Sequence, residues 1–177
     1  VGGGLEVVDL STPKDPVIVS RTELEGLSPY GGHLALAGDL AFVVGDGLLK
    51  VINVSDPSFP REMVSLGDFR FSHGIAAAEV HVYVADGAGG LRVVDVSNPT
   101  APREVGRVDT PEGTAGVHVA GTHAFVAAGD AGLRVIDVSD PANPVEIWAY
   151  YVGNSNDVVK LGNYVFVAAG SSQLAHG

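Results

Sequence analysis

The chain has 177 residues, enough for one domain of ordinary size, and 10 Lys and Arg against 21 Asp and Glu give it a formal net charge of −11. The phosphates of nucleic acids and the surfaces of anionic membranes repel such a protein, so we expect neither as a partner. The absence of cysteine excludes disulfides and thiolate chemistry, and no apolar run reaches the roughly 18 residues of a membrane-spanning helix.

One nine-residue stretch occurs four times along the chain. It reads LEVVDLSTP from Leu5, LKVINVSDP from Leu49, LRVVDVSNP from Leu91 and LRVIDVSDP from Leu133, at intervals of 44, 42 and 42 residues. A fixed period of this length indicates an array of one supersecondary unit, in which each unit buries its faces only against its neighbours.

Each unit contains four short apolar segments, which in the unit beginning at Leu91 cover 91–96, 103–108, 116–120 and 123–128. The segments are rich in Val and Ile and are bounded by Gly, Pro, Asn and Asp, the pattern of strands rather than helices. The segment that begins each unit is apolar at nearly every position, so it requires cover on both faces. We therefore predict an all-β chain built as a β-propeller of four-stranded blades of about 42 residues.

Counted from the propeller axis outward, the four strands of a blade are A, B, C and D. The chain starts with strands C and D and finishes with strands A and B, at 157–162 and 164–169. The two ends are thus complementary, and we expect 5–10 to pair with 164–169 and to close a ring of four blades. Residues 1–177 then form a single domain; the alternative is that they form part of a larger propeller.

The units resemble the LVIVD repeat, a β-propeller repeat of bacterial and archaeal proteins. The resemblance is carried by LRVVDVSNPTAP from Leu91 and LRVIDVSDPANP from Leu133, each preceded by an aromatic residue, Val and Ala at 83–85 and 125–127. It extends over essentially the whole chain. It implies the fold, but the family is defined by residues that build blades and brings no catalytic set.

The repeated polar residue of the motif is Asp or Asn in every unit. We expect Asp9, Asn53, Asp95 and Asp137 to accept backbone N–H bonds in the adjoining turn rather than to form a ring of metal ligands. The acidic residues in the B-to-C connections, as in Asp46-Gly47, fit hairpin turns better than calcium loops.

The connections from strand D to the next strand A differ most between units, and propeller topology places them at the mouth of the central channel. His33, His73, Asn156 and Asp157 align within one position of one another there. Two imidazoles and a carboxylate, those of His33, His73 and Asp157, could hold a divalent metal. The plainer interpretation is a set of polar residues at a hydrated rim, without a cofactor.

The same connections have an aromatic and arginine content that is unusual for this chain, and such residues dominate binding hot spots. They are Tyr30, Phe69, Arg70, Phe71 and Tyr151. An alternative for Phe69 or Phe71 is that the ring covers the core of a blade.

No nucleophile elbow, zinc-protease helix motif or phosphate-binding loop is present in the sequence. We therefore expect a non-enzymatic module that presents loops to a protein or carbohydrate partner, outside the cytoplasm or at the cell surface; a cytoplasmic location stays open. Two alternatives are a propeller hydrolase or lyase with a metal at the channel mouth, and a structural module that completes a larger ring by self-association.

Overall fold

The computed structural model describes residues 2–29, 32–70, 72–111 and 113–170. These residues form sixteen strands and no helix, so nothing in the described part is a helix long and apolar enough to cross a membrane. The strands are β1 (Gly4–Asp9), β2 (Val17–Glu23), β3 (His33–Ala37), β4 (Leu40–Gly45), β5 (Leu48–Asn53), β6 (Arg61–Leu66), β7 (Gly74–Ala78), β8 (His81–Ala85), β9 (Leu91–Asp95), β10 (Arg103–Val108), β11 (Gly116–Ala120), β12 (His123–Ala127), β13 (Leu133–Asp137), β14 (Val145–Tyr150), β15 (Ser155–Leu161) and β16 (Tyr164–Ala169).

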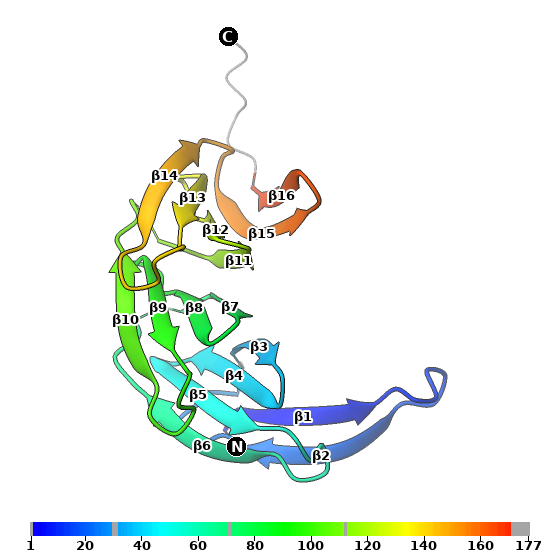
Figure 1. Cartoon of the computed structure of the whole chain (residues 1–177). Helices are drawn as coiled ribbons and strands as arrows, with labels where there is room; N and C mark the ends of the chain where they lie inside the picture. The colour runs from blue at the N-terminus through cyan, green and yellow to red at the C-terminus, as the bar shows by residue number, and fades with distance from the viewer. Residues whose placement is uncertain (1, 30–31, 71, 112, 171–177) are drawn as a thin grey trace.

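Twelve of these strands form three antiparallel sheets of four, β3 to β6, β7 to β10 and β11 to β14, each in the order of the chain. We call these sheets blades 1, 2 and 3. Their innermost strands pack on one another, β3 against β7, β7 against β11 and β11 against β15. Figure 1 shows these four strands on the concave side of an arc, with β6, β10 and β14 on its outer side. The predicted all-β, propeller-type architecture is confirmed.

The core lies between the blades, as the apolar C strands require. Phe42 and Val51 of blade 1 form one buried cluster with Val82 and Val94 of blade 2, and Ile75 of β7 packs against it. The prediction that the first segment of each unit is covered on both faces is confirmed for the unit beginning at Leu91, since Val93 and Val94 are fully buried.

The predicted pairing of 5–10 with 164–169 is wrong for this structure. Within the described residues β1 pairs only with β2, and β15 pairs only with β16, so each hairpin is a separate two-stranded sheet. Figure 1 shows the two hairpins at opposite ends of an open arc. Each blade closes through local hairpins, whereas closing the ring requires the rotation between successive blades to add up to a full turn.

Because the arc is open, the C strand of blade 3 is less completely buried than the C strands of blades 1 and 2. Ile136 of β13 is fully buried as predicted, but Val135 is only partly buried. Val135 packs at the edge of the cluster that blade 3 forms with the β15–β16 hairpin. Its counterparts in the first two blades, Val51 and Val93, face a complete neighbouring blade and are fully buried.

Candidate functional site

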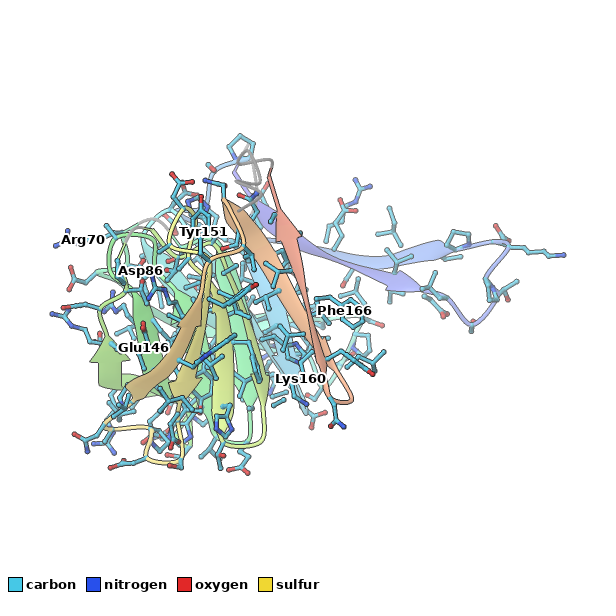
Figure 2. All side chains as sticks on the ribbon, turned by 90° about the horizontal axis from the view of Figure 1, so that it is seen from above. Arg70, Asp86, Glu146, Tyr151, Lys160 and Phe166 are labelled. Atoms are coloured by element: carbon cyan, nitrogen blue, oxygen red, sulfur yellow. The ribbon has the colours of Figure 1, made fainter. Side chains whose placement is uncertain are left out.

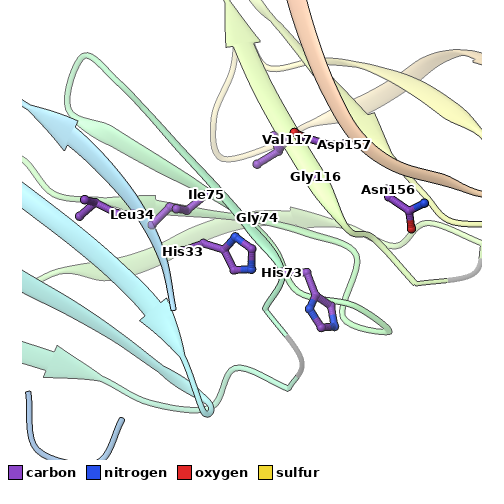
Figure 3. A pocket seen from close by; sticks show the side chains of 9 residues that line it. All are labelled: His33, Leu34, His73, Gly74, Ile75, Gly116, Val117, Asn156 and Asp157. Carbon is purple, nitrogen blue, oxygen red and sulfur yellow. The ribbon is translucent and has the colours of Figure 1, made fainter. Parts of the chain in front are cut away.

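A pocket of about 280 Å³ lies where the innermost strands begin. Residues of β3, β7, β11 and β15 line it, and Figure 3 shows the two imidazoles next to each other, with Asn156 and Asp157 across the pocket. The lining residues are His33, Leu34, His73, Gly74, Ile75, Gly116, Val117, Asn156 and Asp157. The structure thus brings together the four polar residues that sequence alignment places at the channel mouth.

The strand pairing explains why these residues meet. His33, Gly74, Gly116 and Asp157 are equivalent positions, because each lies opposite the same position of the neighbouring B strand. Two of these positions are glycine because the inner strands approach closely there. A Cβ at Gly74 would lie 2.7 Å from the carbonyl oxygen of Ala115, and one at Gly116 would lie 2.9 Å from the Cα of Asp157.

The pocket is polar, and its titratable groups interact. The rings of His33 and His73 lie edge to face, with their centroids 6.5 Å apart. Burial lowers the pKa of His33 from its usual value of 6.5, the positive charge of a protonated His73 lowers it further, and the Asp157 carboxylate partly opposes both. Asp157 also accepts the backbone N–H of Val158 at 2.8 Å.

A metal centre needs at least three convergent ligands. Within the described residues, no three His, Asp or Glu side chains gather closely enough to form such a group. The inner positions of blade 3 at the pocket are Ala115 and Gly116, which offer no side-chain ligand. The metal site of His33, His73 and Asp157 therefore stays a prediction.

The loop face is the end of the arc formed by the D-to-A connections and the B-to-C turns. Arg70 and Tyr151 are both exposed, Tyr151 at 65%, and Figure 2 shows them at the same end of the molecule. Phe69 follows the alternative given for it above, in which the ring covers the core, rather than contacting a partner. It is 5% exposed, belongs to the core cluster between blades 1 and 2, and lies under the guanidinium of Arg92 at 4.1 Å. Tyr30 and Phe71 lie outside the described residues.

Acidic side chains of the B-to-C turns hold the D-to-A connections in place. The carboxylate of Asp46 accepts the backbone N–H of Ser28 at 2.7 Å, and that of Asp86 accepts the N–H of Arg70 at 2.7 Å. In blade 3, Asp130 accepts an N–H of the Asn154 side chain at 2.8 Å. The carboxylates therefore anchor the loops, one from the B-to-C turn of each blade, and they give the loop face a fixed shape.

The repeated Asp or Asn of the motif has the expected structural role. Asp9, Asn53, Asp95 and Asp137 each accept the backbone N–H of the residue two positions later, a serine, at 2.7 to 2.9 Å. These Asx turns begin the C-to-D connections on the face opposite the loop face.

Sequence reasoning missed an ion pair that repeats in each blade. The basic residue after the leading leucine of the motif pairs with the glutamate twelve residues later, as Lys50 Nζ does with Glu62 at 2.9 Å. The basic residues are Lys50, Arg92 and Arg134. The constant interval of twelve residues between the basic residue and the glutamate could have indicated this pair from the sequence. Lys50 and Arg92 are buried, so these pairs belong to the blades rather than to the site.

A second pocket, of about 470 Å³, opens on the face opposite the loop face between blades 2 and 3. His81 and Tyr83 line one side of it, and Ser139 and Pro141 of an Asx turn line the other. Its walls include residues of the repeated Asx turn, whose role is to form the connection between strands C and D of a blade. The loop face, where the units differ, is the stronger candidate.

Comparison with known proteins places the chain in a family. The family model of the LVIVD repeat matches residues 30–68, 70–110, 113–152 and 152–175. No curated protein matches the chain. Among solved structures, the chain is similar to the computationally designed Ika4 protein, with 14% sequence identity and a TM-score of 0.68 over 83% of this chain and 89% of that one. At this identity the similarity concerns the fold alone.

Proposed function

Because this chain belongs to the LVIVD-repeat family of β-propeller proteins, whose shared residues build blades, we propose that it is a non-enzymatic binding module that recognises a protein or glycan through its loop face. The observation that carries the proposal is the convergence of His33, His73, Asn156 and Asp157 on one pocket of that face. Loops held by a rigid scaffold are the usual location of binding residues.

The chemistry of the loop face supports a polar ligand. The pocket offers imidazole, amide and carboxylate groups that can donate and accept hydrogen bonds. Arg70 and Tyr151 are exposed at the same end of the molecule, and arginine and tyrosine dominate binding hot spots. The anchoring carboxylates fix the loops before a ligand arrives, which lowers the entropic cost of binding.

The experiment compares two sets of substitutions with the labelled chain on a glycan array and on a displayed peptide library. In the first variant Arg70 and Tyr151 are both replaced by alanine. In the control, Asn98, Thr100 and Asn143, which lie on the opposite face, are replaced by alanine. If the first variant loses the bound glycan or peptide and the control retains it, the proposal is supported. If the control loses it and the first variant retains it, binding takes place on the opposite face and the proposal is wrong.

The metal-dependent alternative has its own test. Protein purified without added metal is analysed for zinc, manganese and other divalent ions, and stoichiometric metal that disappears in His33→Ala would favour the hydrolase or lyase hypothesis. An extracellular or cell-surface location is likewise a prediction, which fractionation of the producing cells would check.

A further inference from the structure

Two leucines of β3 are more exposed than the equivalent residues of the other inner strands. Leu34 is 49% exposed and Leu36 is 62% exposed. Strand pairing makes Leu34 equivalent to Ile75, Val117 and Val158, which pack against the preceding blade. Ile75 is partly buried, and Val117 and Val158 are 9% and 2% exposed. On one side β3 packs against β7; on the other side, in the described residues, it meets the two-stranded β1–β2 sheet, which has no inner strand.

The other end of the arc lacks the opposite half of this contact. Phe166 of β16 is 58% exposed, whereas the equivalent aromatic residues Phe42, Tyr83 and Phe125 are 0%, 4% and 8% exposed. The inner strand of the following blade covers each of those three rings. Figure 2 shows Phe166 on the side of its hairpin that points away from the blades. Within the described part of the chain, the Phe166 ring is therefore exposed because no inner strand packs over it, and Leu34 is exposed because no aromatic ring packs against it. Each end of the arc carries the contact surface that the other end is missing.

The strand edges are complementary in the same way. β1 is a C strand paired with its D strand, and β16 is a B strand paired with its A strand; in the described residues the second edge of each is unpaired. The three complete blades pair strands B and C in one register, for example Phe125 with Val135 and Ala127 with Leu133. Transferred to the two hairpins, that register pairs Phe166 with Val7, Val165 with Val8 and Ala168 with Leu5.

The outer strand of blade 3 completes the pattern. Trp148 is 52% exposed, and its equivalents Gly106 and Ser20 both lie against the C-to-D turn of the next blade. A Cβ at Gly106 would lie 2.3 Å from the carbonyl oxygen of Pro141, and the Ser20 hydroxyl donates to the carbonyl oxygen of Pro57 at 2.7 Å. The turn equivalent to those at Pro57 and Pro141 that would pack against Trp148 is the β1–β2 turn, which contains Pro13.

We propose that these surfaces bind a second copy of the chain, with β16 of each copy pairing with β1 of the other. The two hairpins of one molecule lie at opposite ends of its arc, so a second molecule supplies each missing half (Figure 1). Each copy contributes three complete blades, and the two shared blades bring the ring to eight, within the range of known propellers. Both loop faces then lie on the same side of the ring, which displays two copies of the pocket.

Sedimentation and light scattering of the 177-residue chain test the stoichiometry. A discrete mass of two chains is expected. Because both copies are acidic, salt should tighten the dimer. Trp148 is the only tryptophan of the sequence, and its emission should shift to shorter wavelength as the dimer forms. A monomer at all concentrations, or a mass that grows without limit, overturns the proposal.

Disulfide formation tests the register, because the chain has no cysteine of its own. One chain carries Val8→Cys and another carries Val165→Cys; mixed and oxidised, they should form a covalent pair, since directly opposed residues lie about 5 Å apart. The control replaces the second chain by Val167→Cys, which would be about 7 to 8 Å away and should not form the bond. Equal crosslinking in both mixtures overturns the predicted register.

A third variant separates association from folding. Leu36→Glu changes a side chain that is exposed in the single chain, so the circular dichroism spectrum should stay unchanged while the dimer weakens by at least about tenfold. An unchanged dimer overturns the proposal, as does a monomeric parent chain in which hydrogen exchange shows β1 and β16 protected, since that would mean closure within one molecule.

Discussion

A guanidinium nitrogen of Arg92 lies 3.2 Å from a carboxylate oxygen of Asp86, with the side chains 8% and 1% exposed. The same carboxylate accepts the backbone N–H of Arg70 at 2.7 Å and the hydroxyl of Ser72 at 2.9 Å. Arg92 also donates to the carbonyl oxygen of Asp68. One buried ion pair therefore connects the middle of blade 2 to the connection that carries an exposed arginine of the loop face.

Replacing Asp86 by alanine should destabilise the protein by about 3 to 5 kcal/mol. The change leaves the buried Arg92 guanidinium without one of its two carboxylates and removes two loop hydrogen bonds. Urea unfolding followed by circular dichroism measures the free energy. Asp46→Ala is the matched control, because Asp46 occupies the same turn in blade 1 but is exposed and accepts one loop N–H, so its loss should cost only about 1 kcal/mol. Equal costs would mean that burial of the ion pair does not matter.

Val93→Ala should cost about 1 to 3 kcal/mol, because it removes two methyl groups from a site without exposure and leaves a void. Val135→Ala, at the equivalent position of blade 3, should cost less under conditions where the chain is monomeric, since Val135 already meets solvent. Denaturant midpoints of the two variants, measured at the same protein concentration, check the order. A larger effect at Val135 would contradict the arrangement of the last blade.

Hydrogen bonds from the hydroxyl and the backbone N–H of Ser97, followed by the contact with Arg103, lower the pKa of Asp95 from 3.8 to about 2. A lowered carboxyl pKa means that the unfolded state binds more protons, so the stabilisation is present above pH 4 and is lost as the pH falls towards 2. Asp95→Asn keeps the acceptor, as Asn53 does in blade 1, but should flatten the stability profile between pH 4 and 2. An unchanged acid profile for Asp95→Asn would refute this assignment.

The protonation of His33 should respond to both of its charged neighbours. His73→Gln removes a positive charge and should raise the pKa of His33, whereas Asp157→Asn should lower it further. Because the pKa of His33 is lowered in the folded state, the unfolded chain binds the proton more tightly, so the contribution of His33 to stability is greatest above pH 6.5 and falls as the pH drops below that value. Imidazole proton shifts across the titration report the change, and His118→Gln is the control because His118 lies outside the pocket.

Several of these features could be predicted from the sequence because they depend on contacts that recur within one unit. The motif at Leu91 and Leu133 predicts the C strand, its Asx turn and the paired D strand, all of which form between residues close along the chain. The meeting of His33, His73, Asn156 and Asp157 follows from the same repetition, because equivalent strand starts lie at equivalent places around the arc.

The tertiary structure alone decided the contacts between the repeated units and at the two ends of the arc. The sequence left open whether Phe69 contacts a partner or covers the core; in the structure the ring is buried between blades 1 and 2, under Arg92 from the next unit. Whether β1 and β16 meet depends on the rotation from each blade to the next, summed over the whole arc. The repeat motif specifies hydrogen bonds within a blade, whereas that rotation depends on how side chains of different units pack, so one sequence pattern is compatible with rings of different size.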